Sequence, residues 1–210
     1  MPRLPPAPFV YPIVDAARLH GRDVAAVVDT LARAGAVLIQ LRAKGRPDRR
    51  LVALAREAIA AAHASGALLV VNDRADIARL VGADGLHLGQ EDLPASEARR
   101  VVGPDVLVGV STHGLAQLEA AAGEPVDYVA IGPVFPTRTK ENPDPVVGLE
   151  MVRQARALTS RPLVAIGGIT RENARAVVEA GADGVAVVSD LMDAPDLARA
   201  LGQLAAAVRG

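Results

Sequence analysis

The sequence predicts an α/β protein folded as one compact (β/α)8 barrel, the TIM-barrel class. Short apolar runs rich in β-branched residues recur along the 210 residues, and a stretch rich in Ala, Leu and Arg with helical spacing follows each of them. The runs are continuous rather than alternating, which is typical of parallel strands buried on both faces. Eight such units close a barrel, and 210 residues is at the compact end of its size range.

The eight units are read from the chain in order. The predicted strands are 10–14, 37–41, 68–71, 85–88, 106–110, 128–131, 163–166 and 184–188. The predicted helices lie near 23–34, 48–64, 74–81, 95–102, 114–122, 148–159, 171–180 and 194–208. Because a helix follows every strand, we expect parallel pairing through right-handed crossovers. An open doubly wound sheet is the alternative, but no Gly-x-Gly-x-x-Gly turn follows the first strand.

Two segments, VGADGLHLGQ at 81–90 and AGADGVAVVS at 180–189, resemble each other. In each, a helix is expected to end at Gly and a strand to start after Asp-Gly, as in repeated helix-to-strand turns. No shift in composition marks a boundary, so residues 1–210 are expected to form a single domain.

The composition argues against several classes of protein. With 23 basic and 24 acidic residues, the chain has no net field that would attract nucleic acid or anionic lipid. Two Phe, two Tyr and no Trp leave little for bases to stack on. No apolar run reaches the ~20 residues of a membrane span, and we see no signal peptide. The absence of Cys fits a reducing compartment. We therefore expect a cytoplasmic protein with neither nucleic acid nor a membrane as partner.

The chain uses Lys at only two positions, Lys44 and Lys140, among its 23 basic residues. Both follow predicted strands, and in barrels of this class the chemistry lies on the loops at the carboxyl ends of the strands. A compact ammonium differs from the planar fork of Arg. We therefore expect both lysines to be functional.

Polar residues alternate at the end of the second predicted strand, at Gln40, Arg42 and Lys44. If the segment stays extended, the three side chains point to one side, into the mouth of the barrel. An amide, a guanidinium and an ammonium together suit a phosphorylated ligand. The alternative is a solvated loop before the next helix.

Carboxylates follow the third and fourth predicted strands, at Asp73 and Asp92. Neighbouring strands lie only ~4.8 Å apart, so two such charges would repel unless a cation lay between them. Oxygen ligands without Cys point to a hard ion such as Mg²⁺. The alternative is that each Asp caps the helix that follows it.

The remaining strand ends complete two anionic subsites. Ser111 follows strand 5, and the longest connection, 132–147, carries Thr137, Thr139 and Lys140. Gly168 follows strand 7 and Ser189 follows strand 8, where many barrels bind phosphate. His87, flanked by leucines within a strand, is expected to be packed and hydrogen-bonded rather than catalytic.

The chain resembles the thiamine phosphate synthase family. The matching segments are QLRAK at 40–44, NDR at 72–74, GLHLGQED at 85–92, GVSTH at 109–113, GPVFPTRTK at 132–140 and AIGGI at 165–169. They occur in the family's order and extend over nearly the whole chain. The segment 141–147 matches no motif.

The resemblance implies a (β/α)8 barrel that joins a hydroxymethylpyrimidine diphosphate to a hydroxyethylthiazole phosphate and releases pyrophosphate. In this reading, pyrophosphate leaves first and the thiazole nitrogen then captures the pyrimidine carbon. The implied ligands of the pyrimidine diphosphate are Gln40, Arg42, Lys44, Asn72, Ser111 and Lys140, of which Arg42, Lys44 and Lys140 would be catalytic. Asp73 and Asp92 would hold one Mg²⁺ per subunit. The implied ligands of the thiazole phosphate are Thr137, Thr139, Gly168, Val188 and Ser189. The partners would be two phosphorylated small molecules, with a homo-oligomer possible.

Three other functions are alternatives to the synthase activity that the resemblance implies. Tautomerase and regulator relatives share the barrel but are expected to lack the Gln-x-Arg-x-Lys and Pro-Thr-x-Thr-Lys sets, and this chain has both. A non-catalytic sensor of phosphorylated ligands would use the same pockets without turnover. A sugar-phosphate isomerase or epimerase would use the sites after strands 7 and 8 but leave the two lysines unexplained.

Overall fold

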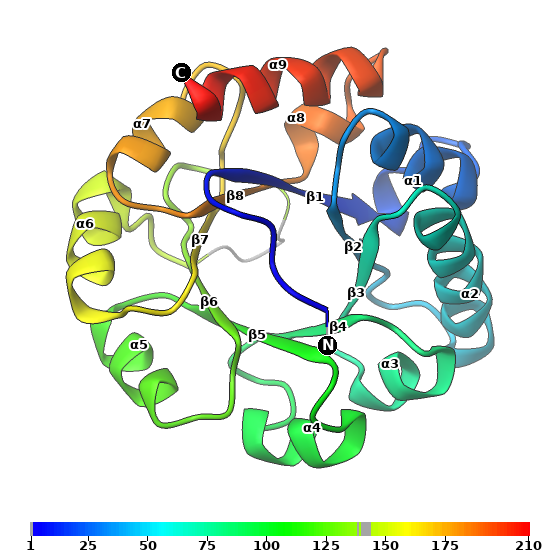
Figure 1. Ribbon diagram of the computed structural model, residues 1–210, viewed down its shortest axis with the longest axis horizontal. Coiled ribbons are helices and arrows are strands. Elements are labelled where there is room, and N and C mark those ends of the chain that lie inside the picture. Colours follow the sequence, from blue (N-terminus) through cyan, green and yellow to red (C-terminus); the bar gives the residue numbers. More distant parts are fainter. Residues whose placement is uncertain (1, 138, 140–143) are drawn as a thin grey trace.

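The computed structural model describes residues 2–137, 139 and 144–210, which form a closed barrel of parallel strands in sequence order (Figure 1). The strands are β1 (Phe9–Asp15), β2 (Leu38–Arg42), β3 (Leu68–Asn72), β4 (Gly85–Leu88), β5 (Leu107–Thr112), β6 (Tyr128–Ile131), β7 (Leu163–Ile166) and β8 (Gly184–Val187). The helices are η1 (Ala16–Arg18, a 3-10 turn), α1 (Val24–Arg33), α2 (Asp48–Ala64), α3 (Ala75–Val81), α4 (Ala95–Val102), α5 (Leu115–Ala122), α6 (Gly148–Leu158), α7 (Ala174–Glu179), α8 (Ser189–Met192) and α9 (Leu197–Arg209). The predicted (β/α)8 barrel is confirmed.

Each predicted strand is present, with differences at the ends. Val37, placed in a strand by its hydrophobicity, lies outside β2 and is 50% exposed. β5 continues through Ser111 and Thr112, so the predicted site residue Ser111 lies on a strand rather than after one. The short elements η1 and α8 were not predicted, because three or four residues are too few to show a helical period.

The apolar residues form two clusters, one on each side of the strands. The interior cluster contains alternate residues of the strands, among them Phe9, Tyr11, Leu38 and Tyr128. The larger cluster lies between the strands and the surrounding helices. Burial on both sides explains why the strands read as continuous apolar runs.

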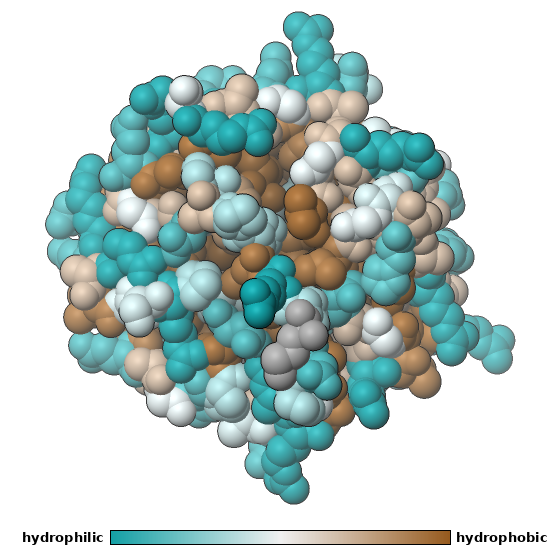
Figure 2. Space-filling view, in the orientation of Figure 1, coloured by the Kyte–Doolittle hydropathy of each residue, from teal (hydrophilic) through white to brown (hydrophobic). Residues whose placement is uncertain are grey.

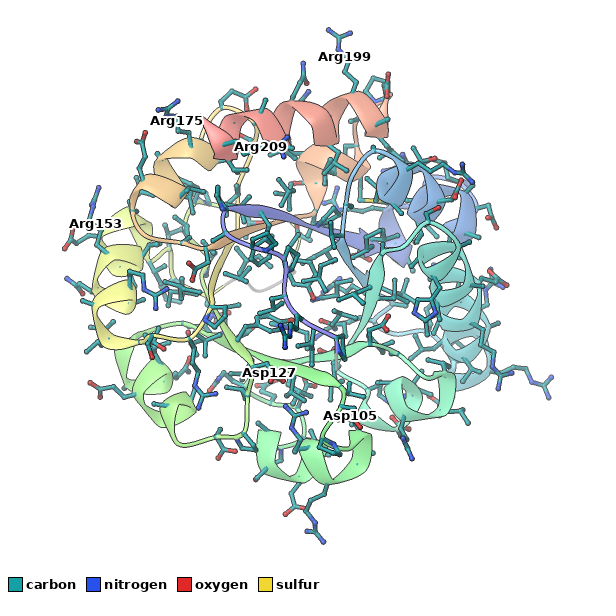
Figure 3. All side chains as sticks on the ribbon, in the orientation of Figure 1. Asp105, Asp127, Arg153, Arg175, Arg199 and Arg209 are labelled. Atoms are coloured by element: carbon teal, nitrogen blue, oxygen red, sulfur yellow. The ribbon has the colours of Figure 1, made fainter. Side chains whose placement is uncertain are left out.

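The face seen in Figure 1 is the one at which the strands begin, and the segment 2–8 crosses in front of the barrel. Leu4 of this segment packs against the interior cluster. Hydrophilic and hydrophobic residues are intermixed over this face (Figure 2), and Arg153, Arg175 and Arg199 point outward from the surrounding helices (Figure 3). No helix in the described part of the chain is long and apolar enough to cross a membrane.

An aspartate precedes three alternate strands on this face and ties each to the strand before it. The three residues are Asp84 before β4, Asp127 before β6 and Asp183 before β8. Each carboxylate accepts a hydrogen bond from a backbone N–H of the preceding strand, at 2.7 Å for Asp127 and 2.8 Å for Asp183. Each also contacts a basic residue, such as Arg99 for Asp127 at 2.7 Å. The resemblance between 81–90 and 180–189 therefore has a structural cause, since both contain this aspartate.

Replacing Asp127 with alanine is expected to destabilise the fold by about 1–3 kcal/mol, because the amide of the buried residue Val108 would lose its acceptor. A urea unfolding curve measures this loss. The matched control is Asp105→Ala, since Asp105 is exposed on the same face (Figure 3). Equal unfolding midpoints for the two variants would contradict the assigned role of Asp127.

Candidate active site

A pocket opens at the carboxyl ends of the strands, opposite the face shown in Figure 1. It brings together residues from every part of the barrel, and every described site residue predicted from the sequence except Asp92 lines it. These lining residues are Gln40, Arg42, Lys44, Asn72, Asp73, Ser111, Thr137, Thr139, Gly168, Val188 and Ser189. Lys140, predicted to be catalytic, lies outside the described residues.

The three polar residues predicted to alternate at the end of β2 all line this pocket. Gln40 is buried, and its Nε2 donates to Tyr11 OH at 3.0 Å. Arg42 donates to the buried carboxylate of Asp15 at the end of the neighbouring strand β1. Lys44, half exposed, lies with its Nζ 3.2 Å from Asp73 Oδ2. The reading of this segment as only a solvated loop is therefore wrong.

Asp73 and Asp92 lie close together around the end of β4. The amide of Asp73 donates to the carbonyl of His87 at 2.7 Å, and Asp92 Oδ2 accepts the amide of Gly89 at 2.6 Å. Burial and the neighbouring carboxyl of Asp92 raise the pKa of Asp73, and the ammonium of Lys44 offsets only part of this rise. The two carboxylates thus repel each other when both are ionised.

The alternative role, in which each aspartate caps the following helix, is not found. In the described chain, α3 starts after Arg74 and α4 after Pro94, and neither receives a side-chain cap bond. Asp73 instead has a left-handed backbone, with φ of 67°. Such conformations are uncommon outside Gly, Asn and Asp and cluster at functional sites.

The acidic pair fits a hard divalent cation. Both donors are carboxylate oxygens, and a cation between them would relieve the repulsion that, after burial, raises the pKa of Asp73. Within the described residues no group of three or more acidic or histidine side chains could hold a metal. Mg²⁺ commonly takes only one or two carboxylates and completes its shell with water and substrate phosphate.

The opposite side of the pocket is built from the loops after β7 and β8. Gly168 has φ of 63°, and a Cβ there would lie 2.5 Å from the carbonyl oxygen of Pro136, so only Gly lets the loop after β7 meet the connection after β6. Asn173 holds this turn, because its Nδ2 donates to the carbonyl of Gly168 and its Oδ1 accepts the amide of Thr170. Ser189 begins the short helix α8, whose first amides lie beside the pocket.

The connection 132–147 is fastened to the barrel by His113. His113 Nδ1 lies 2.6 Å from the carbonyl oxygen of Gly132, and its Nε2 lies 3.4 Å from Asp144 Oδ2. Its own amide donates to Gln117. His113 therefore joins the first residue of the connection to a residue near its end. The connection also presents Thr137 and Thr139 to the pocket.

Replacing His113 with alanine is expected to speed amide hydrogen exchange in 144–147 about tenfold, because a bond of this kind is worth about 1–1.5 kcal/mol. Mass spectrometry of peptic fragments measures the exchange. The control is His63→Ala, since His63 contacts Asp84 at the other end of the barrel. Unchanged exchange in His113→Ala would show that the connection is held by other contacts.

The structure adds site residues that the sequence did not reveal. Asp15 follows the same strand-end rule as the predicted residues, but it lies one residue beyond the predicted strand 10–14. Tyr11 gave no signal beyond its rarity in this chain. The roles of His113 and Asn173 depend on contacts across loops, which no local pattern contains. His87 is buried and hydrogen-bonded to Tyr128 and Ser111, as predicted.

Comparison with known proteins identifies the family of this chain. The family model described as thiamine monophosphate synthase matches residues 10–191. A thiamine-phosphate synthase of Koribacter versatilis is 48% identical over 192 residues, which cover 90% of each chain. One of Acidothermus cellulolyticus is 46% identical over 199 residues, covering 94% of this chain and 93% of the relative.

A solved structure agrees with these relatives. The thiamine phosphate pyrophosphorylase of Pyrococcus furiosus superposes with a TM-score of 0.85 at 35% identity, covering 95% of each chain. The sequence motifs lie around one pocket, and both the family model and the relatives span most of the chain. The chain therefore belongs to the thiamine monophosphate synthase family.

Proposed function

We propose that this protein is a thiamine-phosphate synthase that condenses 4-amino-2-methyl-5-hydroxymethylpyrimidine diphosphate with 4-methyl-5-(2-hydroxyethyl)thiazole phosphate, giving thiamine phosphate and pyrophosphate. One observation carries the proposal. A single pocket has a basic and acidic side over β2–β4 and a glycine- and hydroxyl-rich side over β7–β8. Such a pocket suits two phosphorylated ligands held side by side.

The pyrimidine diphosphate is assigned to the β2–β4 side. Arg42 and Lys44 lie there to bind diphosphate oxygens, and the buried ion pair with Asp15 fixes the direction of the Arg42 guanidinium. Asn72, Gln40 and Ser111 supply uncharged hydrogen-bonding groups around the ring. Lys140, outside the described residues, is proposed as a further cation on the diphosphate.

Asp73 and Asp92 are proposed to hold one Mg²⁺ per subunit. Bound there, the ion would neutralise charge on the diphosphate leaving group. The proposal is supported by the repulsion between the two carboxylates and by the position of Lys44 beside them.

The thiazole phosphate is assigned to the β7–β8 side. Thr137, Thr139 and Ser189 offer hydroxyl groups, and the turn at Gly168 exposes backbone amides. Val188 contributes its backbone and an apolar wall at the same edge. Anchoring the phosphate here orients the thiazole nitrogen toward the pyrimidine.

The reaction needs positioning more than a reactive side chain. The bond between the pyrimidine methylene carbon and the diphosphate oxygen breaks, and its electron pair leaves with pyrophosphate. The lone pair of the thiazole nitrogen then forms the new carbon–nitrogen bond. No proton leaves the thiazole nitrogen, so no general base is required at that atom. Arg42, Lys44 and Lys140 stabilise the charge that develops on pyrophosphate.

We also propose that residues 1–210 act as one domain in the cytoplasm. The absence of Cys and the balanced charge support this location. The uninterrupted strand order of the barrel supports the single domain.

The test is incubation of the purified protein with both substrates and Mg²⁺, with each substrate omitted in turn. We expect thiamine phosphate and pyrophosphate in equal amounts, and only when both substrates are present. Binding without product would indicate a sensor, and conversion of one substrate alone would indicate an isomerase. Either result would overturn the proposed function.

A further inference from the structure

A chain of hydrogen bonds crosses the floor of the pocket and joins side chains from β1, β2, β4, β5 and β6. Gln40 Nε2 donates to Tyr11 OH at 3.0 Å, and Tyr11 OH lies 3.1 Å from Tyr128 OH. Tyr128 OH lies 2.9 Å from His87 Nδ1, and His87 Nε2 lies 2.9 Å from Ser111 Oγ. The two ends of the chain, Gln40 and Ser111, line the pocket, whereas Tyr128 is fully buried and is not among the described residues that line it.

Close packing fixes the middle of this chain. A Cβ on Gly109 would lie 2.0 Å from the Tyr128 ring, so Gly at this position is what admits the ring. Tyr11 meets the Tyr128 ring edge-on, with centroids 6.2 Å apart, and His87 stacks on it at 5.6 Å. The Tyr128 hydroxyl therefore has little freedom to seek other partners.

The chemistry of these side chains indicates which group donates and which accepts in each hydrogen bond of the chain. Burial raises the pKa of both tyrosines, so each hydroxyl keeps one proton to donate. A neutral imidazole donates from one nitrogen and accepts at the other. Gln40 donates to Tyr11, so the proton of the Tyr11 hydroxyl is left for Tyr128 OH. The expected order then runs from Tyr128 to His87 Nδ1 and, for a neutral imidazole, from His87 Nε2 to Ser111.

This order fixes opposite hydrogen-bonding roles at the two ends. One N–H of the Gln40 amide is used in the bond to Tyr11, and the amide orientation that this bond sets leaves the carbonyl oxygen, an acceptor, to face a ligand in the pocket. Ser111 accepts from His87 and so offers its hydroxyl proton. Reversing either end requires every bond in the chain to reverse.

We propose that Tyr128 is a positioning residue that sets substrate specificity: it makes Gln40 an acceptor and Ser111 a donor, so that the pocket selects a ring with an amino group toward Gln40 and an unprotonated ring nitrogen toward Ser111. This inference rests on the proposed function, whose 4-aminopyrimidine carries both groups. The 4-oxo analogue presents a carbonyl oxygen where Gln40 also offers one. The pocket is expected to bind the 4-oxo analogue poorly, because two hydrogen-bond acceptors would then face each other without a proton between them.

The first experiment compares kcat/KM for the 4-amino and 4-oxo pyrimidine diphosphates at saturating thiazole phosphate. We expect the unmodified protein to prefer the amino substrate by at least about a hundredfold. Tyr128→Phe keeps the ring but removes the hydroxyl, and we expect this preference to fall at least about tenfold, with the KM for thiazole phosphate unchanged.

The matched control is Thr112→Val. Thr112 is fully buried beside Ser111, and its hydroxyl donates to the carbonyl of Ala130 rather than to this chain of bonds. Thr112→Val therefore removes a buried hydroxyl of the same strand without breaking the chain, and we expect it to keep the preference. A Tyr128→Phe variant that discriminates as well as Thr112→Val would overturn the proposal.

The second experiment needs no substrate. Nitrogen-15 NMR of the unmodified protein is expected to show His87 protonated at Nε2 and unprotonated at Nδ1. Tyr128→Phe is expected to shift the Nδ1 resonance, since that atom loses its donor. The opposite tautomer, or a doubly protonated ring, would overturn the proton order whether or not the protein turns over. Failure of the unmodified protein to condense the two substrates would instead overturn the proposed function, and with it the pyrimidine specificity.

Discussion

Asp73→Asn is expected to lower kcat/KM by at least about a hundredfold while leaving the metal-free protein no less stable than the unmodified one. A loss of about a hundredfold in rate is typical when a group that stabilises charge in the transition state is removed. Asparagine is the suitable replacement, because it tolerates the left-handed backbone at this position. It also removes the repulsion with Asp92, which together with burial raises the pKa of Asp73. The measurements are steady-state rates and thermal unfolding with chelator and with Mg²⁺.

Stability should depend on pH in a way that identifies Asp73. Its folded-state pKa is raised above the ordinary value of 3.8, so ionisation of this group favours the unfolded chain. The contribution of Asp73 to folding is therefore lowest at neutral pH. It grows as pH falls through the raised pKa toward 3.8. Asp73→Asn should lack this contribution.

The control for both measurements is Asp105→Ala, since Asp105 is an exposed carboxylate on the opposite face of the barrel. Mg²⁺ together with the pyrimidine diphosphate should raise the melting temperature of the control but not that of Asp73→Asn. A fully active Asp73→Asn variant would contradict the assignment of Asp73 as a metal ligand.

Lys44→Ala is expected to lower kcat/KM by about a hundred- to a thousandfold, because the ammonium beside Asp73 is lost from the diphosphate side of the pocket. Its side chain is half exposed, so we expect no loss of folding. Lys44→Arg should recover only part of the rate, since a planar guanidinium does not replace a compact ammonium. Initial rates of pyrophosphate release over a range of pyrimidine diphosphate concentrations measure these effects.

The KM for thiazole phosphate should not change in Lys44→Ala, because its proposed ligands lie on the other side of the pocket. The control is Arg153→Ala, which removes an exposed cation pointing outward from α6 (Figure 3). Rates of Lys44→Ala within threefold of this control would show that Lys44 does not act on the diphosphate.

The fold and much of the pocket could be predicted because they depend on local rules. Strand order and number determine the barrel, and alternation at and just after the end of β2 brings Gln40, Arg42 and Lys44 to one pocket. The scarcity of Lys in the sequence predicts a functional role for Lys44, and Lys44 lines the pocket. Asp73 and Asp92 could be paired because β3 and β4 are adjacent in both sequence and space.

The rest depends on contacts across the barrel or between loops. Tyr128 lies on a strand predicted correctly, yet its partners Tyr11 and His87 are set by how far the strands are displaced along one another. No local pattern encodes that displacement. The same holds for His113, whose partner Gly132 follows a different strand. The pairing of Asp15 with Arg42 could not be predicted either, because it depends on the register of β1 against β2.

The most direct measurement is anomalous diffraction from crystals grown with Mn²⁺, pyrophosphate and thiamine phosphate. We expect one strong peak at about 2.1 Å from carboxylate oxygens of Asp73 and Asp92, with pyrophosphate between it and Lys44. The phosphate of the product should lie against Gly168 and Ser189 in the same pocket. A peak elsewhere, or the two anions on opposite ends of the barrel, would contradict the account.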